Sequence, residues 1–198
     1  MTDGTKLDKN ALNTLFLEAR SYNGWLAQDV PVSLLHQIHD LARMGPTAAN
    51  SCPMRVVFVK SKEAKEKLKP FLDKGNQEKT MAAPVVALFA MDRKFYDHLP
   101  KLFPHTDAKS WFEGKPDKIE DTMVRNATLQ AAYFMLAARS LGLDCGPMSG
   151  FKKAGVKEAF FPDLDGEVNF ICSLGYGDKA AIFPRLPRFE FDEVCGIV

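Results

Sequence analysis

The run at residues 83–92 (APVVALFAMD) constrains the fold more than any other part of the chain, because it is apolar almost throughout and is bounded by charge. Successive side chains of a strand point to opposite faces of its sheet, so a strand with this sequence is apolar on both faces. Such a strand needs cover on both sides. We therefore predict a buried strand at the centre of a sheet.

Two further runs predict strands. Residues 55–60 (RVVFVK) are short and rich in the β-branched side chains that favour strands. Residues 167–175 (EVNFICSLG) alternate in polarity, which should place these apolar side chains on one face: Val168, Phe170, Cys172 and Leu174.

Helical spacing occurs before and between these strands. One predicted helix has an apolar face of Leu12, Leu15, Phe16 and Ala19; Asp8 or Asn10 should cap it, and it should end near residues 23–24. A second helix begins beside residues 31–33, ends before Gly45 and buries Leu34, Leu35, Ile38, Leu41 and Ala42. Ser61 should cap a third helix, whose apolar face is Ala64, Leu68, Phe71 and Leu72 and which Pro70 can kink.

Residues 117–143 predict one long helix that is apolar almost all round from 131 to 138. This pattern indicates neighbours on every side, including a subunit partner. Gln130, Arg139 and Ser140 interrupt the apolar stretch, so we expect a buried helix and not a membrane span. Gly142 is the expected C-cap.

The remaining segments have weaker patterns. Residues 93–116 mix aromatic side chains with charges, and such a segment carries function or holds short helices. A weak helix is expected at 152–161, and the tail from residue 176 ends in a strand-like FEF at 189–191. The resulting order, α-α-β-α-β-α-α-β, predicts a single α+β (mixed α/β) domain over residues 1–198.

Composition excludes several classes of partner. Lys and Arg total 26 against 25 Asp and Glu, a net charge of +1 without long runs of one sign, so neither nucleic acid nor a membrane surface is an expected partner. The four cysteines form no C-x-x-C pair and no secretory leader precedes them. We expect reduced thiols in a cytoplasmic protein.

The sequence gives little support to a dinucleotide-binding fold, a metal site or a hydrolytic nucleophile. Residues 175–180 read G-x-G-x-x-A after a strand, but too few residues follow for the helix and strand of a dinucleotide fold, so we interpret these as turn glycines. The four histidines show no metal-ligand spacing, and no G-x-S-x-G elbow occurs. We predict no metal and no hydrolytic nucleophile.

Polar clusters gather where predicted elements end, which is where binding residues usually lie. They occur at residues 19–25 (ARSYNGW), 46–53 (PTAANSCP), 75–79 (GNQEK), 146–151 (GPMSGF) and 185–188 (RLPR). Together, and in this order, they resemble the motifs of the nitroreductase family of FMN enzymes, with the malonic semialdehyde reductases of pyrimidine catabolism as the nearest branch. The resemblance covers about residue 12 to the C-terminus.

The resemblance implies an intertwined homodimer, a sheet flanked by helices, and FMN at the subunit interface. The implied phosphate ligands are Arg20 and one or both of the C-terminal arginines, Arg185 and Arg188, with Ser21 and Asn23 in the same first motif as Arg20. Asn76 would pair with the uracil-like edge of the flavin, and Lys79 would stabilise the reduced ring. Backbone near Pro147, Met148, Ser149 and Gly150 would approach the hydride-accepting nitrogen. Thr47, Ala48 and Asn50 would come from the partner subunit.

Two positions depart from the family pattern. Asn23 stands where many relatives have a second basic residue, and Ser149 stands where a glutamate is often found. Fewer charges near the flavin should alter its potential and its choice of acceptor.

The implied reaction is ping-pong: NADH or NADPH reduces FMN, leaves, and is replaced by a small acceptor. Because the flavin carries the hydride chemistry, we expect no essential catalytic side chain. The expected acceptor is 3-oxopropanoate (malonic semialdehyde), reduced to 3-hydroxypropanoate. The alternatives are a nitroaromatic or quinone reductase of broad specificity and a flavin-binding protein without turnover.

Overall fold

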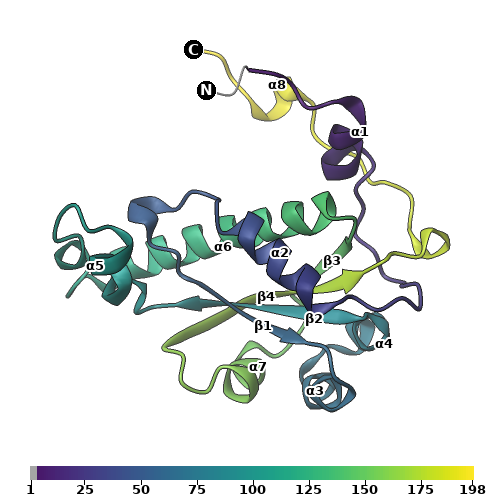
Figure 1. Cartoon of the computed structure of the whole chain (residues 1–198), viewed down its shortest axis with the longest axis horizontal. Coiled ribbons are helices and arrows are strands. Elements are labelled where there is room, and N and C mark those ends of the chain that lie inside the picture. Colours follow the sequence, from purple (N-terminus) through teal and green to yellow (C-terminus); the bar gives the residue numbers. More distant parts are fainter. Residues whose placement is uncertain (1–3) are drawn as a thin grey trace.

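The computed structural model describes residues 4–198, and a four-stranded antiparallel sheet of order β1-β2-β4-β3 lies at its centre (Figure 1). The strands are β1 (Met54–Val59), β2 (Val85–Asp92), β3 (Asp144–Met148) and β4 (Gly166–Gly175). Every residue of β2 is buried, and β2 pairs with β1 on one side and β4 on the other. The prediction of a central strand covered on both faces is confirmed.

Helices cover the two faces of the sheet, which gives three layers. On one side α2 (Val32–Ala42) packs against the long α6 (Pro116–Ser140). On the other side lie α3 (Lys62–Leu68), α4 (Lys74–Ala82) and α7 (Lys153–Phe160) (Figure 1).

The two-residue period of β2 produces two cores. Phe89 faces the α2 and α6 layer, where it packs with Ile38 and Phe134. Leu88 faces the opposite layer and belongs to the same apolar cluster as Leu68 and Val156. Both faces of β2 are therefore part of the hydrophobic interior.

β4 differs from the predicted alternation at one point. Phe89 pairs with Phe170 but Ala90 pairs with Val168, so Asn169 is an extra residue on β4. This β-bulge moves Val168 to the α3 and α7 side, whereas Cys172 stays on the other face. The prediction that these side chains share one face was wrong for Val168.

Two regular elements lie where polar loops were predicted. Residues 146–148 belong to β3, although Gly and Pro disfavour strands; β3 is an edge strand, where Pro147 is tolerated. Residues 75–79 belong to α4, which has almost no apolar face and contains Gly75 and Asn76 near its start. In both segments the local sequence disfavours a strand or a helix, and tertiary packing outweighs that preference.

The chain ends also differ from prediction. Asp8 caps α1 (Lys9–Leu12), but the helix continues only as a π-turn at Asn13–Leu17 and does not reach residues 23–24. The chain instead runs beside the β3 edge, with bridges from Ser21 to Cys145 and from Trp25 to Gly177. The FEF sequence forms no strand; Phe191–Val194 is the short helix α8.

Several other expectations are confirmed. α2 ends before Gly45, Ser61 caps α3 by accepting from the Ala64 amide, and Gly142 follows α6 with a φ of +82°.

α3 ends earlier than predicted, because Pro70 lies in a separate 3-10 turn, Lys69–Phe71. No helix over residues 4–198 combines the length and the apolar character needed to span a bilayer.

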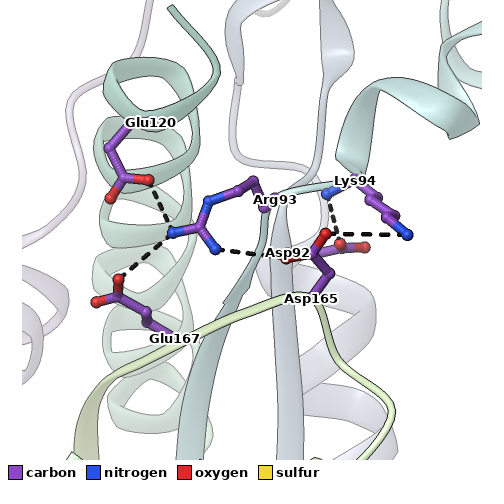
Figure 2. A network of polar contacts seen from close by, with 6 residues as sticks. All are labelled: Asp92, Arg93, Lys94, Glu120, Asp165 and Glu167. Carbon is purple, nitrogen blue, oxygen red and sulfur yellow. Dashed lines mark hydrogen bonds and ion pairs between the residues drawn. The ribbon is translucent and has the colours of Figure 1, made fainter. Parts of the chain in front are cut away.

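Residues 93–116 hold short helices: Phe95–His98, α5 (Leu99–Leu102) and Lys109–Trp111. At the start of this segment Arg93 contacts Glu120 of α6 at 3.0 Å, Glu167 of β4 at 3.4 Å and Asp165 at 3.5 Å (Figure 2). These side chains are partly exposed, so each pair adds little to stability. The network links the end of β2 to β4 and α6.

Replacing Phe134 with Ala tests the interior. Phe134 is 1% exposed and its ring lies 5.1 Å from that of Phe89. We expect the free energy of unfolding to fall by about 3–5 kcal/mol, because the change leaves a cavity in the core. Thermal or urea unfolding at a fixed protein concentration measures the loss. Glu158→Ala, at an exposed position on α7, is the control, and an equal effect of both variants would contradict this account of the core.

Candidate functional site

A cavity of about 820 Å³ lies where the N-terminal segment, the end of α6 and the C-terminal segment meet. Its polar lining includes Ser21 and four arginines: Arg20, Arg139, Arg185 and Arg188. Three of these arginines were predicted as candidate phosphate ligands, and the structure brings them together although about 165 residues separate Arg20 from Arg185.

Backbone carbonyls orient the arginines in this cavity. Arg185 donates through Nη2 to the carbonyls of Leu17 (2.8 Å) and Ala19 (3.0 Å), and Arg20 donates to the Phe183 carbonyl. Within residues 4–198 none of the four arginines forms an ion pair with a carboxylate. Their positive charge is available to an anionic ligand.

Arg139 is the member of this group that the sequence analysis missed as a ligand. Arg139 interrupts the apolar stretch of α6, which by itself indicates only that this helix does not span a membrane. A lone charge at the end of a buried helix is the available signal. The fold places it beside Arg20, and its Nη1 lies 3.4 Å from the Leu15 carbonyl.

The segment after Arg20 runs from the cavity along β3. The Tyr22 amide donates to the Cys145 carbonyl at 3.0 Å, and Asp144 accepts from the Gly177 amide at 2.9 Å. Desolvation raises the pKa of the Tyr22 phenol, the Asp144 carboxylate raises it further and Arg20 lowers it. The phenol is therefore neutral at physiological pH.

A second group of predicted residues meets at Gly150. Asn76 donates through Nδ2 to the Gly150 carbonyl (2.9 Å), and the Asp73 amide donates to the same oxygen (3.1 Å). A Cβ at Gly150 would lie 2.4 Å from Asn76 Nδ2, so only glycine fits without displacing that side chain. Trp25 donates to the Lys79 carbonyl at 3.0 Å, which ties this group to the segment that leaves the arginine cavity.

The third group, at residues 47–52, is strained. Ala49, Asn50 and Cys52 have positive φ values of 51°, 50° and 42°, a backbone region that costs non-glycine residues about 1–3 kcal/mol each. Two hydrogen bonds of 2.8 Å hold the loop: the Ala48 amide donates to Asn126 Oδ1, and Asn50 donates to the Leu102 carbonyl. Thr47 accepts from the Cys52 amide at 3.2 Å. Backbone strain of this kind is concentrated at ligand sites.

The third group lies far from the arginine cavity of the same chain. Asn126 holds the loop, whereas Arg139 lines the cavity, and at about 1.5 Å per residue these two positions on α6 are about 20 Å apart. Figure 1 shows the loop and α5 near one end of α6 and α1 near the other. A single chain does not gather all the predicted residues.

The other predicted residues occupy less suggestive positions. Asn23 is half-buried and does not line the cavity, and Ser149 is exposed after β3. Pro147 pairs with Cys172 in the sheet. Met148 packs against the core and its sulfur lies 3.2 Å from Thr80 Oγ1, so its side chain is committed to the interior.

The glycines of residues 175–177 have a structural explanation. Gly177 lies against the Tyr22 ring, where a Cβ would be 2.2 Å from a ring carbon, and the element directly after it is a 3-10 turn, Lys179–Ala181. These glycines permit close packing and do not open a helix. Over residues 4–198 no three His, Cys, Asp or Glu side chains are placed to bind a metal ion.

Comparisons with known proteins agree with one another. The model of the Nitroreductase family matches residues 18–176. A protein of Burkholderia lata, provisionally named NADH dehydrogenase/NAD(P)H nitroreductase, is 55% identical over 193 residues, which is 98% of this chain and 99% of that protein. A protein of Stenotrophomonas maltophilia with the same provisional name is 56% identical over 191 residues, 96% of this chain and 97% of its own length.

Solved structures show the same fold. A crystal structure of a Bacillus subtilis protein, provisionally described as a nitroreductase, superposes with a TM-score of 0.87 at 25% identity, over 96% of this chain and all of that one. A protein from Exiguobacterium sibiricum, provisionally described as a nitroreductase and solved in complex with FMN, superposes with a TM-score of 0.84 at 19% identity, over 98% of this chain and all of that one. With the family model matching most of the chain and full-length relatives above 50% identity, this protein belongs to the nitroreductase family.

Proposed function

We propose that this protein is an NAD(P)H-dependent oxidoreductase that binds FMN. The observation that carries the proposal is the cavity with four arginines that have no carboxylate partner among residues 4–198, which is joined through residues 21–25 to the Asn76 and Gly150 group. The names of the full-length relatives and the FMN bound to a structural neighbour support the same function.

The residues present fit FMN. A phosphate dianion matches the guanidinium groups of Arg20, Arg139 and Arg185. Cys145 lies beside Ser21, and Gly150 is five residues further along the chain, so the cavity and the second group are at most about 17 Å apart along β3. A span of this kind suits a ligand with a phosphate at one end of a ribityl chain and a ring at the other.

Asn76 and Gly150 would hold the ring. The Asn76 amide nitrogen is engaged by the Gly150 carbonyl, which leaves Oδ1 to accept from an N–H on the ring edge. The closely packed Gly150 lets the backbone approach the ring. The flavin supplies the hydride chemistry when bound, and these residues supply its binding and orientation.

The proposal includes a homodimer in which Thr47, Ala48 and Asn50 complete the partner's site. The loop is too far from its own arginine cavity to do so within one chain. Two elements near these sites carry exposed apolar side chains. They are Val124, Leu129 and Tyr133 on α6, and Phe183, Leu186, Phe189 and Phe191 in the C-terminal segment. A second copy of the chain would cover them.

A second groove supports this assembly. It measures about 650 Å³, lies between α2, α6 and the unpaired edge of β1, and has basic residues His36, Arg43, Arg55 and Lys60 around an apolar floor. The C-terminal segment carries the acidic residues Glu190, Asp192 and Glu193 between its exposed apolar side chains. Arg43, Arg55 and Lys60 each pair with a carboxylate of their own chain, so the match between the groove of one copy and the C-terminal segment of another is mainly one of apolar surface.

For the acceptor we keep the semialdehyde 3-oxopropanoate and a planar nitroaromatic or quinone as the two candidates. The relatives' names favour the second. So does the position of exposed Trp111 and half-buried Phe103, whose rings lie 6.0 Å apart next to Leu102, the residue that holds Asn50. Comparing NADPH oxidation with each acceptor separates the two, and activity with neither would exclude both.

The purified protein should be yellow. We expect the flavin absorption bands, released FMN after denaturation, and bleaching of the bands when NADH or NADPH is added without oxygen. A visible spectrum before and after addition measures this. Protein that takes up no FMN would disprove the proposed function, and bound FMN that no reduced nicotinamide bleaches would favour a flavin-binding protein without turnover.

Arg185→Ala should raise the dissociation constant for FMN. Loss of a hydrogen bond to a charged group costs about 1.5–3 kcal/mol, which corresponds to about 10- to 100-fold in affinity. Quenching of FMN fluorescence on binding measures the change. Arg125→Ala is the matched control, because Arg125 is exposed on α6 and pairs only with Asp121 at 2.6 Å among the ion pairs found over residues 4–198.

A mixed dimer tests whether two chains share each site. Asn50→Ala and Arg185→Ala homodimers should each bind FMN weakly, because every site lacks one ligand. A dimer purified with one chain of each kind has one site with both ligands intact, so it should bind one FMN per dimer with wild-type affinity. Equal, weak binding at both sites of the mixed dimer would show that Asn50 and Arg185 act within one chain.

A further inference from the structure

The residue before α4, Asp73, stands in a capping position that its side chain does not use. Its backbone has the extended geometry of an N-cap (φ −61°, ψ 146°), and Asp is among the most effective capping residues. Yet within the part of the chain that the structure describes, its carboxylate accepts no capping hydrogen bond from α4.

The carboxylate instead faces Gly150. Its Oδ2 lies 2.9 Å from the point that a Cβ on Gly150 would occupy, next to Asn76 Nδ2 at 2.4 Å from the same point. The backbone fixes this arrangement: the Asp73 amide donates to the Gly150 carbonyl at 3.1 Å, and the Asp73 carbonyl accepts from the Asn76 amide at 2.8 Å. A negative charge is thus held beside the two residues proposed to hold the ring.

Over residues 4–198 no basic side chain pairs with the Asp73 carboxylate. The nearest basic residues in sequence are Lys74 and Lys69, and neither forms an ion pair with Asp73 within that range. A carboxylate that caps no helix and forms no ion pair acts on whatever binds next to it. Because Asp73 is exposed, solvent reduces that effect without removing it.

We propose that Asp73 is a tuning residue of the flavin site, which lowers the midpoint potential of the bound flavin by disfavouring the negative charge of its reduced form. The inference rests on the proposed function. Lys79, on the same helix, would act in the opposite direction, so the potential reflects the balance of the two. Asp73 contacts no reacting atom and is not a catalytic residue.

The test is the potential of the FMN-loaded protein, measured by reductive titration against a reference dye. Asp73→Asn and Asp73→Ser remove the charge and keep a good N-cap, so α4 should keep its stability. For both variants we expect the affinity for reduced flavin, relative to oxidised flavin, to rise about fivefold to tenfold. A tenfold change equals about 30 mV for a two-electron couple.

Two further variants make the test specific. Asp73→Glu keeps the charge and should leave the potential close to that of the wild type. Glu66→Gln, at an exposed acid on α3, removes one negative charge elsewhere and should leave it unchanged. An unchanged potential in Asp73→Asn and Asp73→Ser, or an equal rise in Asp73→Glu or Glu66→Gln, would overturn the inference.

The failure of this inference differs from that of the proposed function. A wild-type protein that takes up no FMN removes both. A wild-type protein that binds FMN and is bleached by NADPH, with the same potential in every Asp73 variant, removes only the role of Asp73. In that case Asp73 occupies the N-cap position of α4 by its backbone alone, and its carboxylate near Gly150 has no effect on the flavin.

Discussion

Burial of β2 on both faces is the constraint on which the rest of the structure depends. Its residues alternate between two cores, so neither face can be left to solvent. Helices must therefore lie on both sides of the sheet, and the third and fourth strands complete the layer between them. The polar clusters lie in connections between these layers and, for residues 75–79 and 146–148, in α4 and β3 themselves.

α6 holds segments that are distant in sequence at fixed positions, and these segments make up the candidate site. Two buried amides on it accept backbone hydrogen bonds: Asn126 Oδ1 from the Ala48 amide and Gln130 Oε1 from the Met54 amide, at 2.8 and 2.9 Å. Buried polar groups are costly unless paired, so these bonds fix the strained loop before β1. The same helix carries Arg139 to the opposite end, into the arginine cavity.

The surroundings of each arginine show whether its charge is paired within the chain or is available to a ligand. Arg93 lies among three carboxylates that its own chain supplies (Figure 2). Arg20 and Arg185 instead donate to backbone carbonyls, which orient them without cancelling their charge. The fold thus holds positive charge in one cavity, and an anion is the natural complement of that cavity.

The sequence by itself determined the elements whose patterns are strong: the buried strand at β2, the long α6, the cap at Ser61, and the glycine after α6. It also identified the polar clusters, because their order along the chain is specific even though each cluster alone is ambiguous. Local physics is enough for these features, since periodicity and capping depend on residues close in sequence.

Only the tertiary structure decided the rest. β3 and α4 form against their local propensities, because pairing with β4 and packing around Gly150 outweigh them. Contacts between residues far apart in sequence, such as Arg20 with the C-terminal segment, depend on how the layers assemble. Whether a side chain such as Asp73 caps its helix or faces a neighbouring loop is decided by that packing, which no short-range pattern in the sequence records.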